Sequence, residues 1–175
     1  MPLALLAALE LVACASAPPR TISEALTRMP VAEPEEPTRP EEELMRRTLA
    51  AAIAAGNVPR ERPLVLVRSP FGSARVLPRG TGVTFVILEN AEVKRLAGRY
   101  GPFLYLYLRL DAREGSRGPI NRERLDDDET RADVKLFVLP ASQSPSLLLC
   151  CWGQGATYVK RDGAWIVTSS GRFDI

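Results

Sequence analysis

Apolar residues recur at helical spacing in two stretches of the chain. In residues 41–56 the apolar stripe consists of Met45, Leu49, Ala52 and Ile53. Three glutamates at the start favour the positive end of a helix, and Gly56 with Pro59 supplies a stop. A second stretch, residues 91–99, follows Asn90, which is a favourable N-cap. The pattern therefore predicts two helices, each burying one face.

Elsewhere, short apolar runs and alternating positions indicate β-strands. Residues 64–67 and 83–88 are apolar runs of the length expected for buried strands. Residues 103–111 and 131–139 alternate between apolar and polar over a longer distance. We expect these two longer strands to pair, with a charged loop at residues 112–129 between them.

The C-terminal quarter is typical of a β-hairpin. Strand-like residues 147–152 and 156–160 flank Gly153-Gln154-Gly155, where we expect a bulge that bends the sheet. Asp162-Gly163 then predicts a type I′ turn, which determines the register of the strands on either side. The predicted opposite pairs are Tyr158 with Val167, Val159 with Ile166, and Lys160 with Trp165.

This order of elements predicts an α+β fold in which an N-terminal helix packs on a curved antiparallel sheet, within one domain at residues 41–175. The leucines of residues 103–111 form the buried face of their strand. The other face of the long strands either lines a concave pocket or is simply half-exposed. The polar and aromatic side chains on that face that are candidates for lining a pocket are Tyr105, Tyr107, Arg109, Asp111 and Asp133.

The N-terminal 40 residues differ from the rest of the chain. Residues 3–13 are apolar but too short for a transmembrane helix of about 20 residues, and match the apolar region of a signal peptide. Residues 14–40 contain repeated prolines and glutamates that oppose regular structure. We therefore expect a leader at 1–13 and a linker at 14–40, interrupted by a helical turn near residues 22–29.

The leader ends in Leu11-Val12-Ala13-Cys14, which resembles the lipobox of bacterial lipoproteins. That resemblance implies cleavage before Cys14, lipid modification of its thiol, and a membrane-anchored protein of the cell envelope. One alternative is a soluble secreted protein cut after Ala15 or Ala17. Another is an uncleaved helix in a cytosolic protein.

Composition narrows the possible chemistry. Twenty-three basic and 21 acidic residues give a net charge of +2 without a long basic block, so nucleic acid is not an expected partner. Histidine is absent, which removes the commonest general base and zinc ligand. The acidic run at residues 126–129 lacks the alternation of a calcium loop and indicates a solvated loop. We expect no metal and no cofactor.

Three cysteines offer neither a CxxC motif nor a four-ligand zinc spacing. Cys150 and Cys151 are neighbours, and a disulfide between adjacent residues is strained because their Cα atoms lie too close together. We therefore expect two small apolar side chains buried in a strand rather than a redox pair.

The order helix, strand, helix and antiparallel strands, closing in Tyr-Val-Lys-Arg-Asp-Gly-Ala-Trp-Ile-Val, resembles the nuclear transport factor two-like superfamily with its cystatin-like fold. The resemblance implies a sheet wrapped around a helix to form a conical pocket. Enzymes of this superfamily, such as ketosteroid isomerases, use Asp, His, Tyr or Arg inside the cone, and other members bind without catalysis. By that analogy, Asp111 or Asp133 is a candidate base, and Tyr105 or Tyr107 a candidate oxyanion donor.

Three hypotheses about function follow. The leading one is an exported, lipid-anchored, non-catalytic domain that binds a protein or a small apolar ligand. The second is a small isomerase or hydrolase of the ketosteroid-isomerase type. The third is a cytosolic interaction module.

Overall fold

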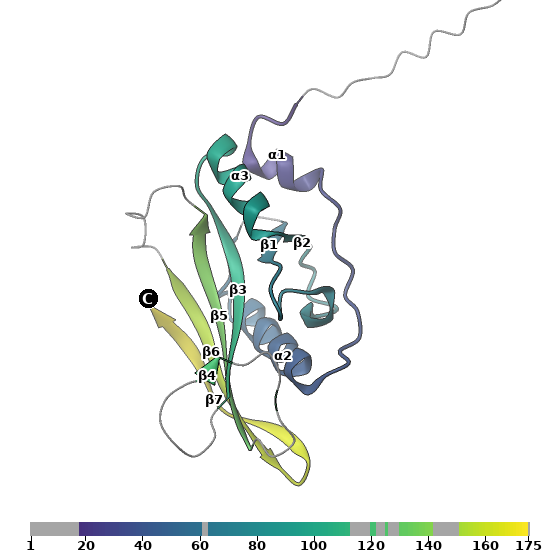
Figure 1. The fold of residues 1–175 in the computed structure, drawn as a ribbon, viewed down its shortest axis with the longest axis vertical. Coiled ribbons are helices and arrows are strands. Elements are labelled where there is room, and N and C mark those ends of the chain that lie inside the picture. The colour runs from purple at the N-terminus through teal and green to yellow at the C-terminus, as the bar shows by residue number, and fades with distance from the viewer. Residues whose placement is uncertain are drawn as a thin grey trace, which may run out of the picture.

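The computed structural model describes residues 18–60, 63–112, 120–121, 125, 130–141 and 151–174 (Figure 1). The helical elements are α1 (Ile22–Thr27), α2 (Pro40–Ala54), η1 (Ala74–Val76) and α3 (Asn90–Tyr100). The strands are β1 (Leu64–Val67), β2 (Phe85–Leu88), β3 (Phe103–Ala112), β4 (Ile120–Asn121), β5 (Arg131–Ala141), β6 (Trp152–Arg161) and β7 (Ala164–Asp174). The predicted α+β class is confirmed.

The strands form one sheet in the order β2-β1-β3-β5-β6-β7, and β4 pairs with the end of β3. From β3 to β7 all neighbours are antiparallel, including the predicted pairing of β3 with β5. The sheet is therefore mostly antiparallel, and the departure from the expected antiparallel sheet is that β1 is parallel to both β2 and β3. Strands that run parallel need a crossover connection. The segment containing η1 connects β1 to its neighbour β2, and α3 connects β2 to β3 on the other side of β1.

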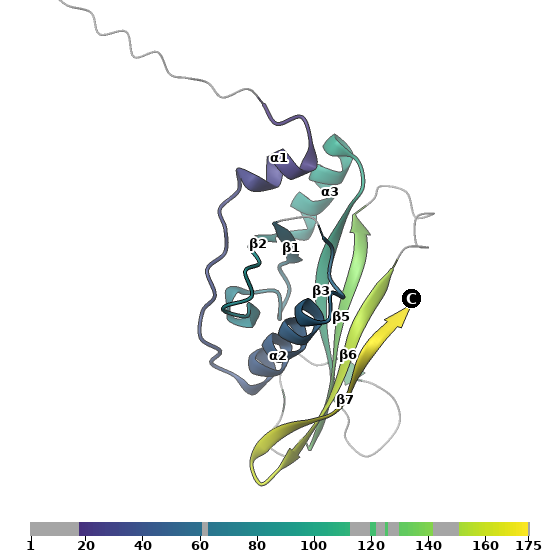
Figure 2. The same ribbon diagram turned by 180° about the vertical axis from the view of Figure 1, so that it is seen from behind.

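The main core lies between α2 and one face of the sheet (Figure 2). Leu106, Leu108 and Leu110 of β3 are fully buried there, as the alternation predicts. Met45 and Leu49 of α2 pack into the same core. One stripe of the predicted helix and one face of the predicted strand are therefore buried against each other.

A second, smaller core lies on the opposite face of the sheet. Val65, Val67 and Val86 point to this side from β1 and β2, and contact Leu26 of α1 and Leu96 of α3. Because both faces of β1 and β2 are covered, these strands are apolar runs rather than alternating sequences.

The β6–β7 hairpin has the predicted register in all three pairs, including Val159 opposite Ile166. Asp162 and Gly163 have positive φ angles of 49° and 78°, as the type I′ turn requires. The bulge expected around Gly153 is wrong: β6 runs unbroken through the glycines, and the register shifts between Thr157 and Tyr158. The bulge is in β7, where Ser169 pairs with Thr157 and Val167 pairs with Tyr158, so that Thr168 is the extra residue.

The described part of the Pro-rich stretch lies along the domain (Figure 1). Leu26 of α1 is buried in the second core. Further along, the amide of Ala32 donates to the carbonyl of Phe85 at 2.8 Å, beside the outer edge of β2. Residues 30–36, called the strap below, then lead into α2. Between α1 and α2 this stretch therefore contacts the rest of the domain at several points, and apart from α1 it is irregular.

Some predicted features lie outside the described residues. These are the leader with Cys14, the acidic run at 126–129, and Cys150. Cys151 is described and is buried. Among the residues that are described, no helix has the length and apolar character needed to cross a membrane.

Candidate functional site

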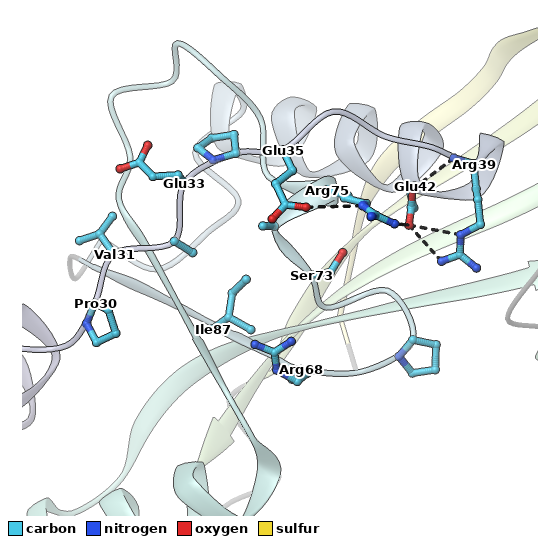
Figure 3. A pocket seen from close by; sticks show the side chains of 14 residues that line it. Pro30, Val31, Glu33, Glu35, Arg39, Glu42, Arg68, Ser73, Arg75 and Ile87 are labelled. Carbon is cyan, nitrogen blue, oxygen red and sulfur yellow. Dashed lines mark hydrogen bonds and ion pairs between the residues drawn. The ribbon is translucent and has the colours of Figure 1, made fainter.

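A cavity of about 670 Å³ lies beneath the strap, between it and the segment that follows β1 (Figure 3). We call it the strap cavity. Its apolar lining includes Val31, Ala32, Pro70 and Ile87. Its polar lining includes Arg39, Glu42, Arg68, Ser73 and Arg75. The site therefore joins the N-terminal strap to β2, the start of α2 and the loop around η1.

Backbone hydrogen bonds and Arg46 hold the strap over the cavity. The amide of Glu35 donates to the carbonyl of Ala74 at 3.0 Å. Arg46, on α2, donates from Nη2 to the carbonyl oxygens of Glu35 and of Arg75, the latter at 3.0 Å. The Arg46 side chain is only 15% exposed, and its hydrogen bond to the Arg75 carbonyl is partly buried.

The start of α2 places Glu42 at the bottom of the site. Its carboxylate accepts hydrogen bonds from the amide and hydroxyl of Thr38, at 2.8 and 3.1 Å, and from the amide of Arg39 at 3.2 Å. The Arg39 guanidinium adds two more, at 3.2 and 3.1 Å. This arrangement belongs to the third position of a helix, where a glutamate reaches back to the N-terminal amides.

Two opposing effects act on the pKa of Glu42, which is only 2% exposed. Burial, the largest single effect, would raise this pKa. The hydrogen bonds from Thr38 and Arg39, with the positive charge of Arg39, together outweigh burial and lower the pKa. Glu42 is therefore an ionised carboxylate near neutral pH, and its acceptor sites are occupied by the protein itself.

Arg75 faces Glu42 and Glu35 across longer distances. Its Nη1 lies 3.7 Å from Glu42 and its Nε lies 3.5 Å from Glu35. Charge-assisted hydrogen bonds between these groups are typically about 2.7–2.9 Å long. Within the described part of the chain, the Arg75 guanidinium donates one hydrogen bond, from Nη1 to the Thr38 hydroxyl at 3.1 Å. Its neighbours thus position Arg75, but within the described part of the chain most of its five N–H groups make no hydrogen bond.

Ser73 and Arg68 flank the cavity from the loop after β1 (Figure 3). The loop is tightened because the Ser69 hydroxyl accepts hydrogen bonds from the amides of Phe71 and Gly72, at 3.3 and 2.9 Å. A Cβ atom at Gly72 would lie 1.8 Å from the carbonyl oxygen of Val67, so this close approach requires glycine. The Ser73 side chain makes no capping hydrogen bond to η1.

The five residues predicted as pocket-lining lie on alternating positions of β3 and β5, away from the α2 core. Asp111 is directly opposite Asp133 in the sheet. Asp111, 2% exposed, lies 3.0 Å from Arg109 Nη2 and 3.3 Å from Lys135 Nζ. Asp133 accepts a hydrogen bond of 2.7 Å from the Thr157 hydroxyl. The two carboxylates are thus brought together and held by neighbouring side chains.

Tyr105 and Tyr107 line a separate cavity of about 200 Å³, together with Asn90 at the start of α3. The pKa of Tyr105 is raised, first by burial and then by the nearby Cys151 and Tyr107. Neither aspartate lines this cavity. The structure therefore pairs the tyrosines with each other and the aspartates with each other, but does not place a carboxylate in the tyrosine cavity.

A further cavity of about 240 Å³ lies beside α1 and is mainly apolar, with Ile22, Leu26, Phe103 and Leu104 in its walls. Ligand sites in proteins commonly enclose about 300–1,000 Å³. By that measure the cavities at α1 and at the tyrosines are small, whereas the strap cavity is well within the range.

No pattern in the sequence indicates the strap cavity directly. The three glutamates at residues 41–43 indicate a helix start, and nothing local distinguishes Arg39, Arg68 or Arg75 from other arginines. A usable signal was present in the complementary charges of two irregular segments, Glu35-Glu36 among prolines and Arg75 and Arg79 in a Gly/Pro-containing stretch. Such complementarity suggests contact but does not locate a cavity.

Comparison with known protein families, curated proteins and solved structures finds no match for this chain. Among the described residues, no group of three or more potential metal-binding side chains comes together. A functional proposal therefore depends on the geometry of the site itself.

Proposed function

We propose that this protein is a non-catalytic binding domain and that the strap cavity holds a small organic ligand. The observation that carries this proposal is a cavity of about 670 Å³ that both apolar and polar side chains line. Ligand sites usually combine an apolar lining with a few convergent polar groups. The expected ligand is therefore a small molecule with an apolar body, contacting Ile87 and Ala32, and a polar group near Ser73 and Arg75.

The catalytic alternative has less support. A carboxylate and a phenol acting on one substrate must both reach it, because proton transfer needs distances of about 2.6–3.2 Å. Here Asp111 is engaged by Arg109 and Lys135, and the tyrosine cavity contains neither aspartate. These observations favour binding over isomerase or hydrolase chemistry.

A relationship to the cystatin-like cone is also a proposal. It is supported by a long helix, α2, packed against a sheet that is antiparallel from β3 to β7. Met45 and Leu49 fill the space between this helix and the sheet, where members of that superfamily form their pocket. A filled cone is consistent with a member that binds its ligand elsewhere, under the strap.

We propose, in addition, that the protein is exported and anchored to the cell envelope through a lipid on Cys14. The support is Leu11-Val12-Ala13-Cys14 at the end of an apolar leader. Cells that express the full chain should incorporate radiolabelled palmitate into it, and Cys14→Ser should move it from the membrane fraction to the soluble fraction. No labelling, with the variant still in the membrane fraction, would show that the anchor is wrong. An unlabelled protein found in the cytosol would instead favour the interaction module.

Binding in the strap cavity can be tested without knowing the natural ligand. Hexanol, hexanoate and hexylamine share an apolar body and differ in charge, so at least one of them should shift the amide NMR signals of Ala32, Ser73 and Ile87. Ser73→Phe should abolish these shifts by placing a ring in the cavity. The control is Ser170→Phe, at an exposed position on β7. If none of the three probes shifts these amides, the proposed function is wrong.

A further inference from the structure

We infer that the ligand of the strap cavity is a carboxylic acid with an apolar body, whose carboxylate binds between Arg68 and Arg75 beside Ser73. This inference rests on the proposed function, because it assigns a ligand class to the same cavity. Its basis is that some hydrogen-bonding groups around the cavity already have partners within the protein, whereas others have spare capacity (Figure 3).

The acceptor at the base of the cavity is saturated. Glu42 receives five hydrogen bonds, all from Thr38 and Arg39. A carboxylate has about four lone-pair sites in total, so Glu42 has no capacity left for a donor on a ligand. A ligand that carries an ammonium group therefore gains little from Glu42.

The guanidinium groups of Arg68 and Arg75, by contrast, have spare capacity to donate hydrogen bonds. A guanidinium has five N–H groups. Among the described residues Arg75 uses one of these in a hydrogen bond, to Thr38, while its two carboxylate contacts are 3.5 and 3.7 Å long. Arg68 contacts one carboxylate in this part of the chain, with its Nε 2.8 Å from Glu89. The N–H groups that Arg68 and Arg75 do not use in these contacts can therefore donate to an acceptor on the ligand.

Charge selects a carboxylate over a doubly charged phosphate. The charged side chains that line the cavity balance, with Arg39, Arg68 and Arg75 against Glu33, Glu35 and Glu42. A single negative charge disturbs this balance less than the double charge of a phosphate does. The planar guanidinium also matches a carboxylate in geometry, because two parallel N–H groups can reach its two oxygens.

The ligand carboxylate would take over part of the role of Glu35. Glu35 is 61% exposed in its side chain and lies 3.5 Å from Arg75 Nε, so its ion pair is weak and its release costs little. The strap itself remains attached, because the backbone of Glu35 bonds to Ala74 and to Arg46. The apolar body of the acid then lies against Ile87 and Ala32, which also line the cavity.

The test compares octanoate, octylamine and octanol by isothermal titration calorimetry with the folded chain. The three probes have the same apolar body and differ in head group, so differences in their affinity report on the polar groups that line the cavity. Octanoate should bind at least about tenfold more tightly than octylamine or octanol, the factor expected for one charge-assisted hydrogen bond.

Arg68→Gln provides the matched variant. It removes the charge from a cavity residue that no strap contact depends on, and octanoate affinity should fall about tenfold while octanol affinity is unchanged. The control is Arg95→Gln on α3. The Arg95 side chain is 58% exposed and that of Arg68 is 57% exposed, and each arginine pairs with one glutamate. Unlike Arg68, Arg95 does not line the cavity.

The outcomes separate the two proposals. Equal affinities for octanoate, octylamine and octanol overturn the carboxylate inference and leave ligand binding intact. An equal loss in Arg68→Gln and Arg95→Gln also overturns it, because the effect would then reflect overall charge. Failure of all three probes, together with unshifted amides at Ala32, Ser73 and Ile87, overturns the proposed function as well.

Discussion

The hydroxyl groups of Thr48 and Tyr158 lie 2.9 Å apart, joined by a hydrogen bond inside the buried interface between α2 and β6. The Thr48 hydroxyl also lies 2.9 Å from the carbonyl oxygen of Leu44, one turn earlier in the helix. The pair connects residues 110 positions apart in the sequence. It therefore determines how far along the sheet the helix is placed, which apolar packing alone does not specify.

Tyr158→Phe should lower the free energy of unfolding by about 1 kcal/mol, the usual net value of one hydrogen bond. Thr48→Val should cost a similar amount, because it leaves the buried Tyr158 hydroxyl with a long contact of 3.4 Å to Leu44. Urea unfolding of both single variants and the double variant gives the coupling energy. Additive losses would show that the two hydroxyls do not stabilise the fold together.

Stability at alkaline pH should also depend on Tyr158. Burial, the largest effect, raises the pKa of this phenol above its ordinary value, while the Thr48 hydrogen bond and Arg47 act in the opposite direction. Above about pH 10 the unfolded chain ionises while the folded protein retains the proton, so stability falls as pH rises. Tyr158→Phe should therefore lose less stability than the parent between pH 9 and about 11. An identical alkaline decline in both proteins would contradict this.

The stabilisation that Glu42 provides should depend on pH and be lost in acid. Its pKa is lowered in the folded protein, so the stabilisation is present above about pH 4.5 and is lost as pH falls below that value. Glu42→Gln should cost about 1–3 kcal/mol at pH 7, because it disrupts hydrogen bonds to a buried charge. The cost should shrink at pH 3. Glu92→Gln, on the surface of α3, is the control and should change stability by less than about 0.5 kcal/mol.

Gly153 permits a close contact between β6 and the ring of Phe173. A Cβ atom at this position would lie 2.4 Å from both the Leu136 carbonyl oxygen and Phe173 Cζ. Since the Leu136 carbonyl is part of the sheet, it cannot move aside, and Gly153→Ala should cost about 1–3 kcal/mol. Gly171→Ala is the control, because a Cβ there meets no atom within 4 Å. Equal thermal unfolding temperatures for the two variants would contradict the steric explanation.

The elements that were predicted correctly depend on local sequence. The repeat of Met45, Leu49 and Ala52 indicates α2 without knowledge of its partner, and the alternation in β3 identifies Leu106 as buried. The Asp162-Gly163 turn similarly determines the β6–β7 register, because only a few backbone conformations connect two strands that closely.

The strap and its cavity were not predicted, because they depend on contacts between distant residues. Prolines indicate that residues 30–36 avoid regular structure, but they do not say whether the segment leaves the domain or docks on it. Docking depends on the hydrogen bond of Ala32 to Phe85 and on Arg46, whose partner Arg75 is 29 positions away. Neither contact has a local sequence pattern.

The predicted site residues illustrate the same limit. Alternation correctly places Tyr105, Tyr107, Arg109 and Asp111 on one face of β3. Which of them share a cavity depends on neighbouring elements, because the start of α3 forms a cavity with the tyrosines, whereas Lys135 of β5 pairs with Asp111. Periodicity therefore identifies a face but not a pocket.

Arg46 should be the residue on which the position of the strap depends most. It hydrogen bonds to two carbonyl oxygens, of Glu35 and Arg75, and is largely shielded from water. Arg46→Gln should lower the free energy of unfolding by about 1–3 kcal/mol, because two backbone carbonyls lose a charged donor. Hydrogen exchange at the amides of Ala32 and Glu35, which pair with the body of the domain, should become at least about tenfold faster.

Arg79→Gln is the matched control for Arg46→Gln. Arg79 also contacts the strap, through the Glu36 carboxylate and the Pro34 carbonyl, but its side chain is 59% exposed. Exposed ion pairs contribute about 0–1 kcal/mol, so this variant should leave exchange at Ala32 and Glu35 nearly unchanged. If both variants accelerate exchange equally, the strap is held by the sum of its charges. If neither does, the backbone hydrogen bonds suffice to keep the cavity covered without Arg46.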